Sequence, residues 1–261
     1  MSAVSEPRAA ALDRFWQSGD RAWSNPLFAA LYDRWFRVAW DGLEHVPAEG
    51  GALLVANHAG MLPLDGGFIQ LGIEREAGRR VYSLAHHGFW RVPFMGPLLS
   101  RGGAVVAHPE NADRLLREGD FVVVFPEGSK GPVKPPGQRY KLQRFGRGGF
   151  VETAMRAGVP VVPITLLGTE DATPMVATPR LFGRDVPLTA NMLLFGPLLG
   201  VTVQLPVKVR ARVLPPVHFD LPSGLARYPR SVVMDEAEAI RERMQESLDA
   251  MRRRRKSLWT G

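Results

Sequence analysis

Residues 121–130 read Phe-Val-Val-Val-Phe-Pro-Glu-Gly-Ser-Lys, an apolar run that ends in a proline, a carboxylate and a glycine. A short strand that is apolar on both faces is typical of a parallel sheet covered by helices on its two sides. Further candidate strands are Ala52–Ala56, Arg80–Ala85, Ala104–Ala107, Val159–Leu167, Val201–Leu205 and Lys208–Leu214. Helix-like segments, Pro109–Arg117 and Gly149–Arg156, lie between them and are closed by glycines. This alternation predicts an α/β fold, with a mostly parallel central sheet of about seven strands and helices on both faces.

The composition is that of a globular protein, with 45% hydrophobic and 23% charged residues. The chain has no Cys, which excludes disulfide scaffolds, thiolate metal sites and a cysteine nucleophile. Its 33 Lys and Arg outnumber its 26 Asp and Glu, giving a formal net charge of +7. We expect neither a secretory signal nor a spanning helix, because the most apolar stretch, Met192–Pro206, is short and interrupted by Gly and Pro.

The N-terminal residues 1–37 are rich in aromatic side chains and differ in kind from the rest of the chain. Asn25 and Pro26 predict the start of a helix. Its helical spacing gives two adjacent apolar rows, Leu27, Leu31, Trp35 and Val38 beside Phe28, Tyr32 and Phe36. A preceding helix would carry Leu12, Phe15, Trp16 and Trp23. We predict that residues 1–37 form amphipathic helices in a membrane interface; the alternative is packing on the domain core.

The C-terminal residues 234–261 are predicted to form a long amphipathic helix with a basic tail. Apolar residues recur with helical spacing before the run Arg252-Arg253-Arg254-Arg255-Lys256. Simple solvation of this run and attraction to anionic lipid headgroups both stay open. The segment lacks a nucleic-acid-binding motif, so we expect no nucleic-acid partner. The residues between, 38–233, are predicted to form the α/β domain.

One candidate site follows the apolar strand Ala52–Ala56, which runs into Asn57 and His58, with Asp65 after a loop. Ligands of α/β sheets bind at the carboxyl edge of the strands, which is where this imidazole is expected. A His takes up a proton near neutral pH, and a carboxylate on its other nitrogen fixes the tautomer and stabilises the imidazolium. A loop residue followed by a helix cap would give the same pair of residues.

A second candidate site follows residues 121–125. Residues 130–147 carry no acidic side chain and six basic ones: Lys130, Lys134, Arg139, Lys141, Arg144 and Arg147. Such a segment, leading into a helix, can hold phosphate groups through its cations and backbone N–H groups, or be a solvated basic loop. The pair His86-His87 is not expected to bind a metal, because adjacent strand residues point to opposite faces.

These motifs resemble those of the glycerolipid acyltransferases of the lysophosphatidic acid acyltransferase type, the PlsC-like superfamily. The resemblance covers residues of roughly 35 to 215. Asn57, His58 and Asp65 match the first motif. Phe125-Pro126-Glu127-Gly128-Ser129-Lys130 matches the third, with Lys130 in the place of an Arg. Phe145 to Gly148 and the apolar stretch around Pro160 match the remaining two.

Two features depart from the family's pattern. Six residues separate His58 from Asp65, whereas the family usually has four. The segment Gly103-Ala104-Val105-Val106-Ala107-His108, which corresponds to the second motif, lacks the Arg that helps to hold glycerol phosphate in the family. A phosphate on the acceptor is therefore expected at Arg101 or among the basic residues 130–147.

The resemblance implies a membrane-associated enzyme of phospholipid biosynthesis, similar to 1-acylglycerol-3-phosphate O-acyltransferases. It would move a fatty acyl group from acyl-CoA or acyl carrier protein to the hydroxyl of a lysophospholipid or related glycerolipid. His58 would be the general base and Asp65 its orienting partner. Backbone N–H groups near Gly128 or Gly60 would hold the oxyanion. No metal or cofactor beyond the acyl donor is implied.

Glu127 is expected to orient the acceptor hydroxyls, although a carboxylate in this position could also only cap a turn. The other residues expected to bind substrate are Gly128, Ser129, Lys130, Arg101, Arg144 and Arg147. The resemblance also implies a peripheral or monotopic location on the cytoplasmic face of the cell membrane. The oligomeric state is not specified by these motifs. The alternative function is a non-catalytic lipid-binding protein on the acyltransferase scaffold.

Overall fold

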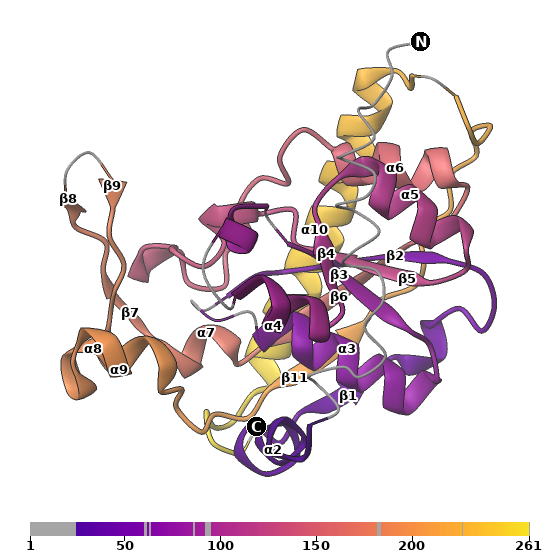
Figure 1. The fold of residues 1–261 in the computed structure, drawn as a ribbon. Helices are drawn as coiled ribbons and strands as arrows, with labels where there is room; N and C mark the ends of the chain where they lie inside the picture. Colours follow the sequence, from indigo (N-terminus) through magenta and orange to yellow (C-terminus); the bar gives the residue numbers. More distant parts are fainter. Residues whose placement is uncertain are drawn as a thin grey trace.

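A computed structural model of the protein describes residues 25–59, 62, 64–85, 87–91, 95–181, 184–225 and 227–260 (Figure 1). The helix predicted to carry Leu12, Phe15, Trp16 and Trp23 lies outside these residues. None of the helices in the described part of the chain combines the length and apolar character that are needed to span a bilayer.

A seven-stranded sheet forms the centre of the molecule, in the order β1-β11-β6-β2-β5-β3-β4. Its strands are β1 (Ala39–Asp41), β2 (Ala52–Ala56), β3 (Val81–Ala85), β4 (Ala104–Val106), β5 (Phe121–Val124), β6 (Val161–Leu167) and β11 (Arg210–Val213). From β6 to β4 all neighbours are parallel, whereas β11 is antiparallel to β6 and β1 is parallel to β11. The predicted mostly parallel sheet is confirmed.

One predicted strand is wrong. Residues 201–205 do not join the sheet, because Val201 and Thr202 end helix α9 (Pro197–Thr202). Pro197 sits in the first turn of α9 directly after Gly196, a combination that starts a helix and breaks a strand. The seventh strand is instead the three-residue β1, which pairs with β11 and is too short to show an alternation in the sequence.

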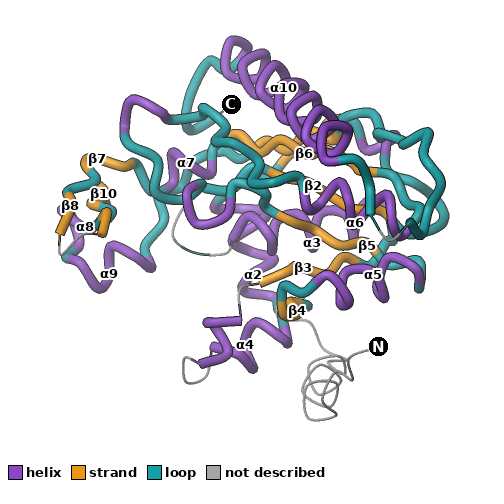
Figure 2. The backbone as a smooth tube through the Cα atoms, turned by 90° about the horizontal axis from the view of Figure 1, so that it is seen from above, coloured by secondary structure: helices purple, strands orange, loops and turns teal. Residues whose placement is uncertain are grey.

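Helices cover both faces of the sheet, as predicted (Figure 2). Alternate residues of β2 face opposite sides: Leu53 and Val55 pack with α5, α6 and α10, and Leu54 and Ala56 pack with α3. These helices are α3 (Leu64–Ala77), α5 (Pro109–Arg117), α6 (Gly149–Ala157) and α10 (Arg230–Arg254). The C-terminal helix begins four residues before its predicted start and buries its predicted apolar face, Ile240, Met244, Leu248 and Met251.

The N-terminal helical segment consists of α2 (Pro26–Ala30) and a π-helical turn over Leu31–Trp35. As predicted, Asn25 caps it, accepting a hydrogen bond from the Leu27 N–H at 2.8 Å. One of its two apolar rows packs on Phe68 of α3: Phe28, Tyr32 and Phe36. From the other row, Leu27 and Trp35 stay 71% and 42% exposed. Leu31 and Val38 of this row pack against the same cluster. The first row therefore follows the core-packing alternative, and the second leaves only Leu27 and Trp35 open to solvent.

A small unit projects from the body of the molecule between β6 and β11 (Figures 1 and 2). Residues 172–188, for which no structure was predicted, contain the short strands β7 (Met175–Ala177), β8 (Arg180–Leu181), β9 (Arg184–Asp185) and the start of β10 (Leu188–Thr189). These strands form two antiparallel pairs, β7 with β10 and β8 with β9. Helices α8 (Ala190–Phe195) and α9 complete the unit, and α4 (Met95–Arg101) and α7 (Thr169–Ala172) complete the described helices.

Candidate active site

The site lies where β2 and β5 end. These two strands are parallel neighbours, with Leu54 opposite Val123 and Val55 opposite Val124. The residues that follow them therefore meet at the carboxyl edge of the sheet. This register brings His58 beside the turn that contains Glu127, as the two motifs predict.

Asn57 fixes the backbone immediately before His58. Its side chain is fully buried and makes two hydrogen bonds to Leu166 of β6, donating to the carbonyl at 3.0 Å and accepting from the N–H at 2.7 Å. The amide thus continues the pairing of β2 with β6 by one further step. A side chain of this length with both a donor and an acceptor is needed for this, which gives the Asn of the motif a physical role.

His58 and Asp65 form a contact despite the six residues between them. Asp65 lies in the first turn of α3, and its Oδ2 is 2.9 Å from His58 Nδ1. The same oxygen accepts a hydrogen bond from the Ala59 N–H at 2.7 Å. The carboxylate is 1% exposed, whereas 22% of the His58 side chain is exposed. The longer loop therefore still delivers the Asp to the imidazole.

This geometry sets the chemistry that the imidazole can do. A carboxylate accepts, so Nδ1 carries the proton in the neutral ring and Nε2 presents its lone pair. Nε2 has no hydrogen-bond partner among the described residues. The ring lies against Phe125, with 4.6 Å between the ring centroids. His58 is therefore held in one orientation and can accept a proton from a group that approaches its exposed edge.

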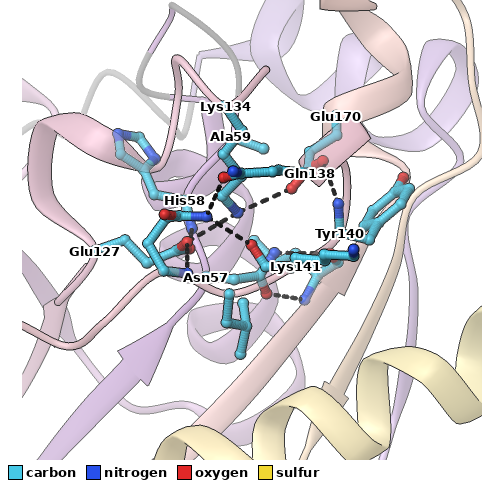
Figure 3. A network of polar contacts seen from close by, with 12 residues as sticks. Asn57, His58, Ala59, Glu127, Lys134, Gln138, Tyr140, Lys141 and Glu170 are labelled. Atoms are coloured by element: carbon cyan, nitrogen blue, oxygen red, sulfur yellow. Dashed lines mark hydrogen bonds and ion pairs between the residues drawn. The ribbon is translucent and has the colours of Figure 1, made fainter. Parts of the chain in front are cut away.

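Glu127 is buried beneath the imidazole, and Figure 3 shows its contacts. Oε1 accepts from the His58 N–H at 3.1 Å, and Oε2 accepts from the Gln143 N–H at 2.8 Å. Lys134 Nζ lies 2.8 Å from Oε2, and neither side chain is more than 4% exposed. Both oxygens are thus bound to the protein itself. Glu127 therefore anchors the ends of β2 and β5 to each other, and its predicted role in orienting acceptor hydroxyls stays a prediction.

The network around Glu127 continues through Lys134 to Glu170. Lys134 Nζ is 3.1 Å from Glu170 Oε1, and Glu170 Oε2 accepts from the Tyr140 N–H at 2.7 Å. Burial opposes the charge of Lys134, but the two carboxylates outweigh it, so the pKa of the ammonium lies above its ordinary value. Burial raises the pKa of the Glu170 carboxyl, and Lys134 offsets this effect only in part. Lys134 is one of the six basic residues of 130–147, and here its ammonium is bound by two carboxylates of the protein.

Tyr140 links the same loop to the end of β6. Its hydroxyl donates to Asp171 Oδ2 at 2.6 Å and accepts from the Gly168 N–H at 2.9 Å. Burial raises the pKa of this phenol to about 12. Asp171 also pairs with Arg139 and with Arg255 of the C-terminal basic run. One cation of that run therefore serves a buried ion pair rather than solvation.

Of the remaining residues predicted to bind substrate, Lys130 and Arg147 lie in loops next to His58 and Glu127. Lys130 is exposed and precedes Gly131, whose Cα lies so close to His58 that a Cβ there would be 2.9 Å from the His58 carbonyl oxygen. Arg147 is exposed and follows Gly146, the residue beside the Pro126 carbonyl. These two cations belong to the loops that border His58 and Glu127.

Arg144 and Arg101 lie on other segments. Arg144 follows Gln143, whose N–H binds Glu127. Hydrogen bonds from Arg241 lower the pKa of Glu238 in α10, and the charge of Arg144 adds to this effect. Arg101 ends α4 just before β4, which lies three strands from β2 in the sheet. The role of both cations in substrate binding stays a prediction.

The Gly128–Lys130 segment forms a short 3-10 turn. Gly128 has a φ of 58°, and its N–H donates to the Phe125 carbonyl at 2.9 Å. This N–H closes the turn, and the expectation that backbone N–H groups near Gly128 hold the oxyanion stays a prediction. Gly60, the other expected donor, lies outside the described residues.

Several residues of the site escaped the sequence analysis. Gly131 and Gln143 carry no chemical group that marks them, because one contributes close packing and the other a backbone N–H. Lys134 was recognised as basic, but its partner Glu170 is 36 residues away. Asn57, in contrast, was marked by its position in the first motif.

Comparisons with known proteins show the family and the fold. A family model described as Acyltransferase matches residues 37–167. An uncharacterized protein of Mycobacterium tuberculosis is 38% identical over 244 residues, which are 90% of this chain and 67% of that protein. A human protein named "DGAT1/2-independent enzyme synthesizing storage lipids" is 24% identical over 219 residues, covering 84% of this chain and 63% of that one. The 1-acyl-sn-glycerophosphate (LPA) acyltransferase PlsC from Thermotoga maritima has the same fold, with a TM-score of 0.57 at 20% identity over 98% of this chain and 86% of that one.

Proposed function

The chain belongs to the acyltransferase family, and we propose that it transfers a fatty acyl group from acyl-CoA or acyl carrier protein to the hydroxyl of a lysophospholipid or related glycerolipid. The observation that carries the proposal is the contact of 2.9 Å between Asp65 and a His58 ring that is partly exposed at the carboxyl edge of the sheet. A buried carboxylate bound to one nitrogen of a solvent-accessible imidazole is the arrangement that general-base catalysis needs.

In the proposed reaction, His58 Nε2 removes the proton of the acceptor hydroxyl. The hydroxyl oxygen bonds to the carbonyl carbon of the thioester, which gives a tetrahedral oxyanion. The carbon–sulfur bond then breaks, and the proton held by the imidazolium passes to the departing thiolate. Asp65 stabilises the imidazolium between these steps and is not itself protonated. No covalent acyl-enzyme is formed.

Glu127 acts in this scheme as a positioning residue. It binds the His58 backbone N–H, and its charge is balanced by Lys134. The Glu127–Lys134 pair therefore fixes the position of the His58 backbone at the end of β2. Misplacement of a general base by about 1 Å is enough to cost on the order of a hundredfold in rate.

The acceptor is proposed to be a lysophospholipid such as 1-acylglycerol-3-phosphate, or a related glycerolipid. Lys130 and Arg147 are exposed beside the site and would meet a phosphate there, whereas Arg101 precedes β4, three strands from β2. A neutral acceptor would need neither cation. The human relative is named for the synthesis of storage lipids, and its name supports the wider class of glycerolipid acceptors.

A location on the cytoplasmic face of the cell membrane is proposed together with this function. Lysolipids reside in membranes and acyl thioesters are water-soluble carriers of the acyl group, so an enzyme joining them works at that boundary. The chain spans about two thirds of the length of its mycobacterial relative, and we confine the proposal to the activity of this part.

The proposal is tested by measuring free-thiol release from acyl-CoA and acyl carrier protein across a panel of lysolipids and monoacylglycerols. We expect thiol release that requires an acceptor and matches the esterified product mole for mole. Preference for phosphate-bearing acceptors should fall in the double variant Lys130→Gln/Arg147→Gln.

The non-catalytic alternative makes the opposite prediction. A lipid-binding protein on this scaffold would bind lysolipid and release no thiol with either donor and any acceptor of the panel. Thiol release without esterified product would contradict acyl transfer too, because it would indicate hydrolysis of the thioester.

A further inference from the structure

The unit that projects from the sheet exposes large apolar side chains at its end. Five of them define what we call the apolar tip: Leu193, Leu194 and Phe195 at the end of α8, and Leu198 and Leu199 in α9. Their exposed fractions are 62%, 69%, 44%, 84% and 60%. A single exposed Leu is ordinary on a protein surface, whereas five within seven residues mark an interaction site.

The apolar tip is held outward by a built scaffold. Asn191 is fully buried and donates to the carbonyls of Ala172 and Val203, at 2.9 and 2.7 Å. Helices α8 and α9 cross so closely at Gly200 that a Cβ there would lie 2.3 Å from the Cα of Met192. The leucines are therefore presented to solvent by a fixed helical hairpin.

Two other segments continue this surface. The Trp35 indole N–H donates to the Gln204 carbonyl just after α9, at 3.0 Å. Arg37 donates to the carbonyls of Pro206 and Trp259, at 2.8 and 2.7 Å. The exposed Leu258 and Trp259 therefore lie near Pro206, in the segment of chain that follows α9. Figures 1 and 2 show the α8–α9 unit at one end of the molecule, away from the central sheet.

Charge is distributed around this surface in a way that identifies its partner. Residues 186–207 contain no Asp, Glu, Lys or Arg. The tail that carries Leu258 and Trp259 begins with the exposed cations Arg252, Arg253, Arg254 and Lys256. Arg252 and Lys256 line a surface cavity of about 320 Å³ together with Arg139. An apolar centre with interfacial Trp and a cationic border complements an anionic bilayer, whereas a second copy would repel it.

We propose that the apolar tip, continued by Trp35 and by Leu258 and Trp259, is a membrane-docking surface that inserts into the interface of an anionic lipid bilayer. This surface is separate from the predicted N-terminal membrane helix around Trp16. The apolar tip is defined by exposure and charge alone. The proposal rests on the proposed function only for the reason why the protein would bind a bilayer, which is that its substrate is a lipid.

The surface also has a connection to the catalytic pair. A small cavity of about 10 Å³, room for about one water molecule, has Ala59, Asp65, Phe36, Ala172 and Gln204 among its lining residues. Gln204 is the residue that holds Trp35, and Ala172 is the residue that holds Asn191. Two residues that hold the docking surface in place, Ala172 and Gln204, therefore line the same small cavity as Asp65.

The test is co-sedimentation of the full chain with vesicles, measured without acyl donor. We expect binding to phosphatidylcholine vesicles that contain phosphatidylglycerol, and weaker binding to phosphatidylcholine alone. The double variant Leu198→Asp/Leu199→Asp should lose about tenfold or more in vesicle affinity. The variant Leu198→Trp should retain it, because Trp favours the interface. The change Arg253→Gln/Arg254→Gln should remove mainly the dependence on phosphatidylglycerol.

The matched control is Leu225→Asp, the same change at another exposed Leu. Leu225 is 41% exposed and follows Gly224, which bonds to Arg156 at the amino edge of the sheet. Equal vesicle binding by the tip variant, the control and the wild type would overturn the proposal. So would a tip variant that only changes molecular mass in light scattering, because a second copy would then be the partner. Failure of thiol release with intact vesicle binding would overturn the proposed function and leave the docking surface standing.

Discussion

The carboxyl edge of the sheet and the apolar tip depart from ordinary burial in opposite directions. At the edge, Glu127, Lys134 and Asp65 are buried where a core usually holds apolar groups. At the tip, Leu198 and its neighbours are exposed where a surface usually holds polar groups. Each departure costs stability, and each is supported by specific contacts around it. The difference indicates two tasks in two regions, with chemistry at the edge and attachment to lipid at the tip.

If the two tasks are separate, changes at the edge should alter stability and turnover and leave vesicle binding unchanged. Changes at the tip should do the reverse. The predictions below use this separation.

The largest expected effect on stability comes from Lys134→Met. It leaves Glu127 and Glu170 buried without their common cation, a change that costs about 3–5 kcal/mol. Chemical denaturation should show this loss as a lower midpoint. The matched control, Lys130→Met, alters an exposed side chain and should stay within about 0.5 kcal/mol. Equal denaturation midpoints for both variants would contradict the buried network.

Asp65→Asn is expected to have the next largest effect, and this effect is on turnover rather than on stability. The amide can no longer hold the tautomer with Nε2 unprotonated or stabilise the imidazolium, so we expect a loss of about a hundredfold or more. Turnover is measured by thiol release, and vesicle binding should not change. Wild-type turnover in this variant would mean that the contact of 2.9 Å only caps α3.

Gly131→Ala should have a smaller effect at the same place. A Cβ would lie 2.9 Å from the His58 carbonyl oxygen and 3.2 Å from Glu127 Cβ, so the end of β2 has to shift. Overpacking of this kind costs about 1–3 kcal/mol. We expect reduced turnover with a smaller loss of unfolding free energy than for Lys134→Met. The control Gly137→Ala, where a Cβ would meet no atom within 4 Å, should behave as wild type.

The smallest expected effect on stability is at the tip. Leu194→Gln changes a side chain that is 69% exposed, and the free energy of unfolding should move by no more than about 0.5 kcal/mol. Vesicle affinity should nevertheless fall. A large drop in the thermal midpoint would show that Leu194 packs against the protein and would weaken the contrast between the two regions.

The sequence predicted the elements whose patterns are local. The apolar run at 121–125 and the boundaries of Pro109–Arg117 depend only on neighbouring residues, and both are confirmed. The failure at 201–205 has the same origin, because its alternation is that of a strand and only Gly196 and Pro197 before it specify a helix. Strand β1 owes its place to pairing with β11, which is remote in sequence.

The parts of the site that depend on the chemical type of a single residue could be predicted from the sequence. The meeting of His58 with Asp65 was expected and is present. The role of Glu127 was not, because its two oxygens are occupied by Lys134 and by backbone N–H groups that the sequence does not place. Arg101 and Arg144 were grouped with the site by charge alone, and their role in substrate binding stays a prediction.

The central claim is that His58 removes the proton of the acceptor hydroxyl, and its most direct measurement is acyl transfer by His58→Ala on vesicles. The matched control is His218→Ala, in a surface cavity beside Val159 and Pro160 at the amino edge of the sheet. We expect His58→Ala to bind vesicles as the wild type does and to lose on the order of a thousandfold in labelled ester formation, whereas His218→Ala should retain it. Labelled ester formed by vesicle-bound His58→Ala at the wild-type rate would show that His58 is not the general base.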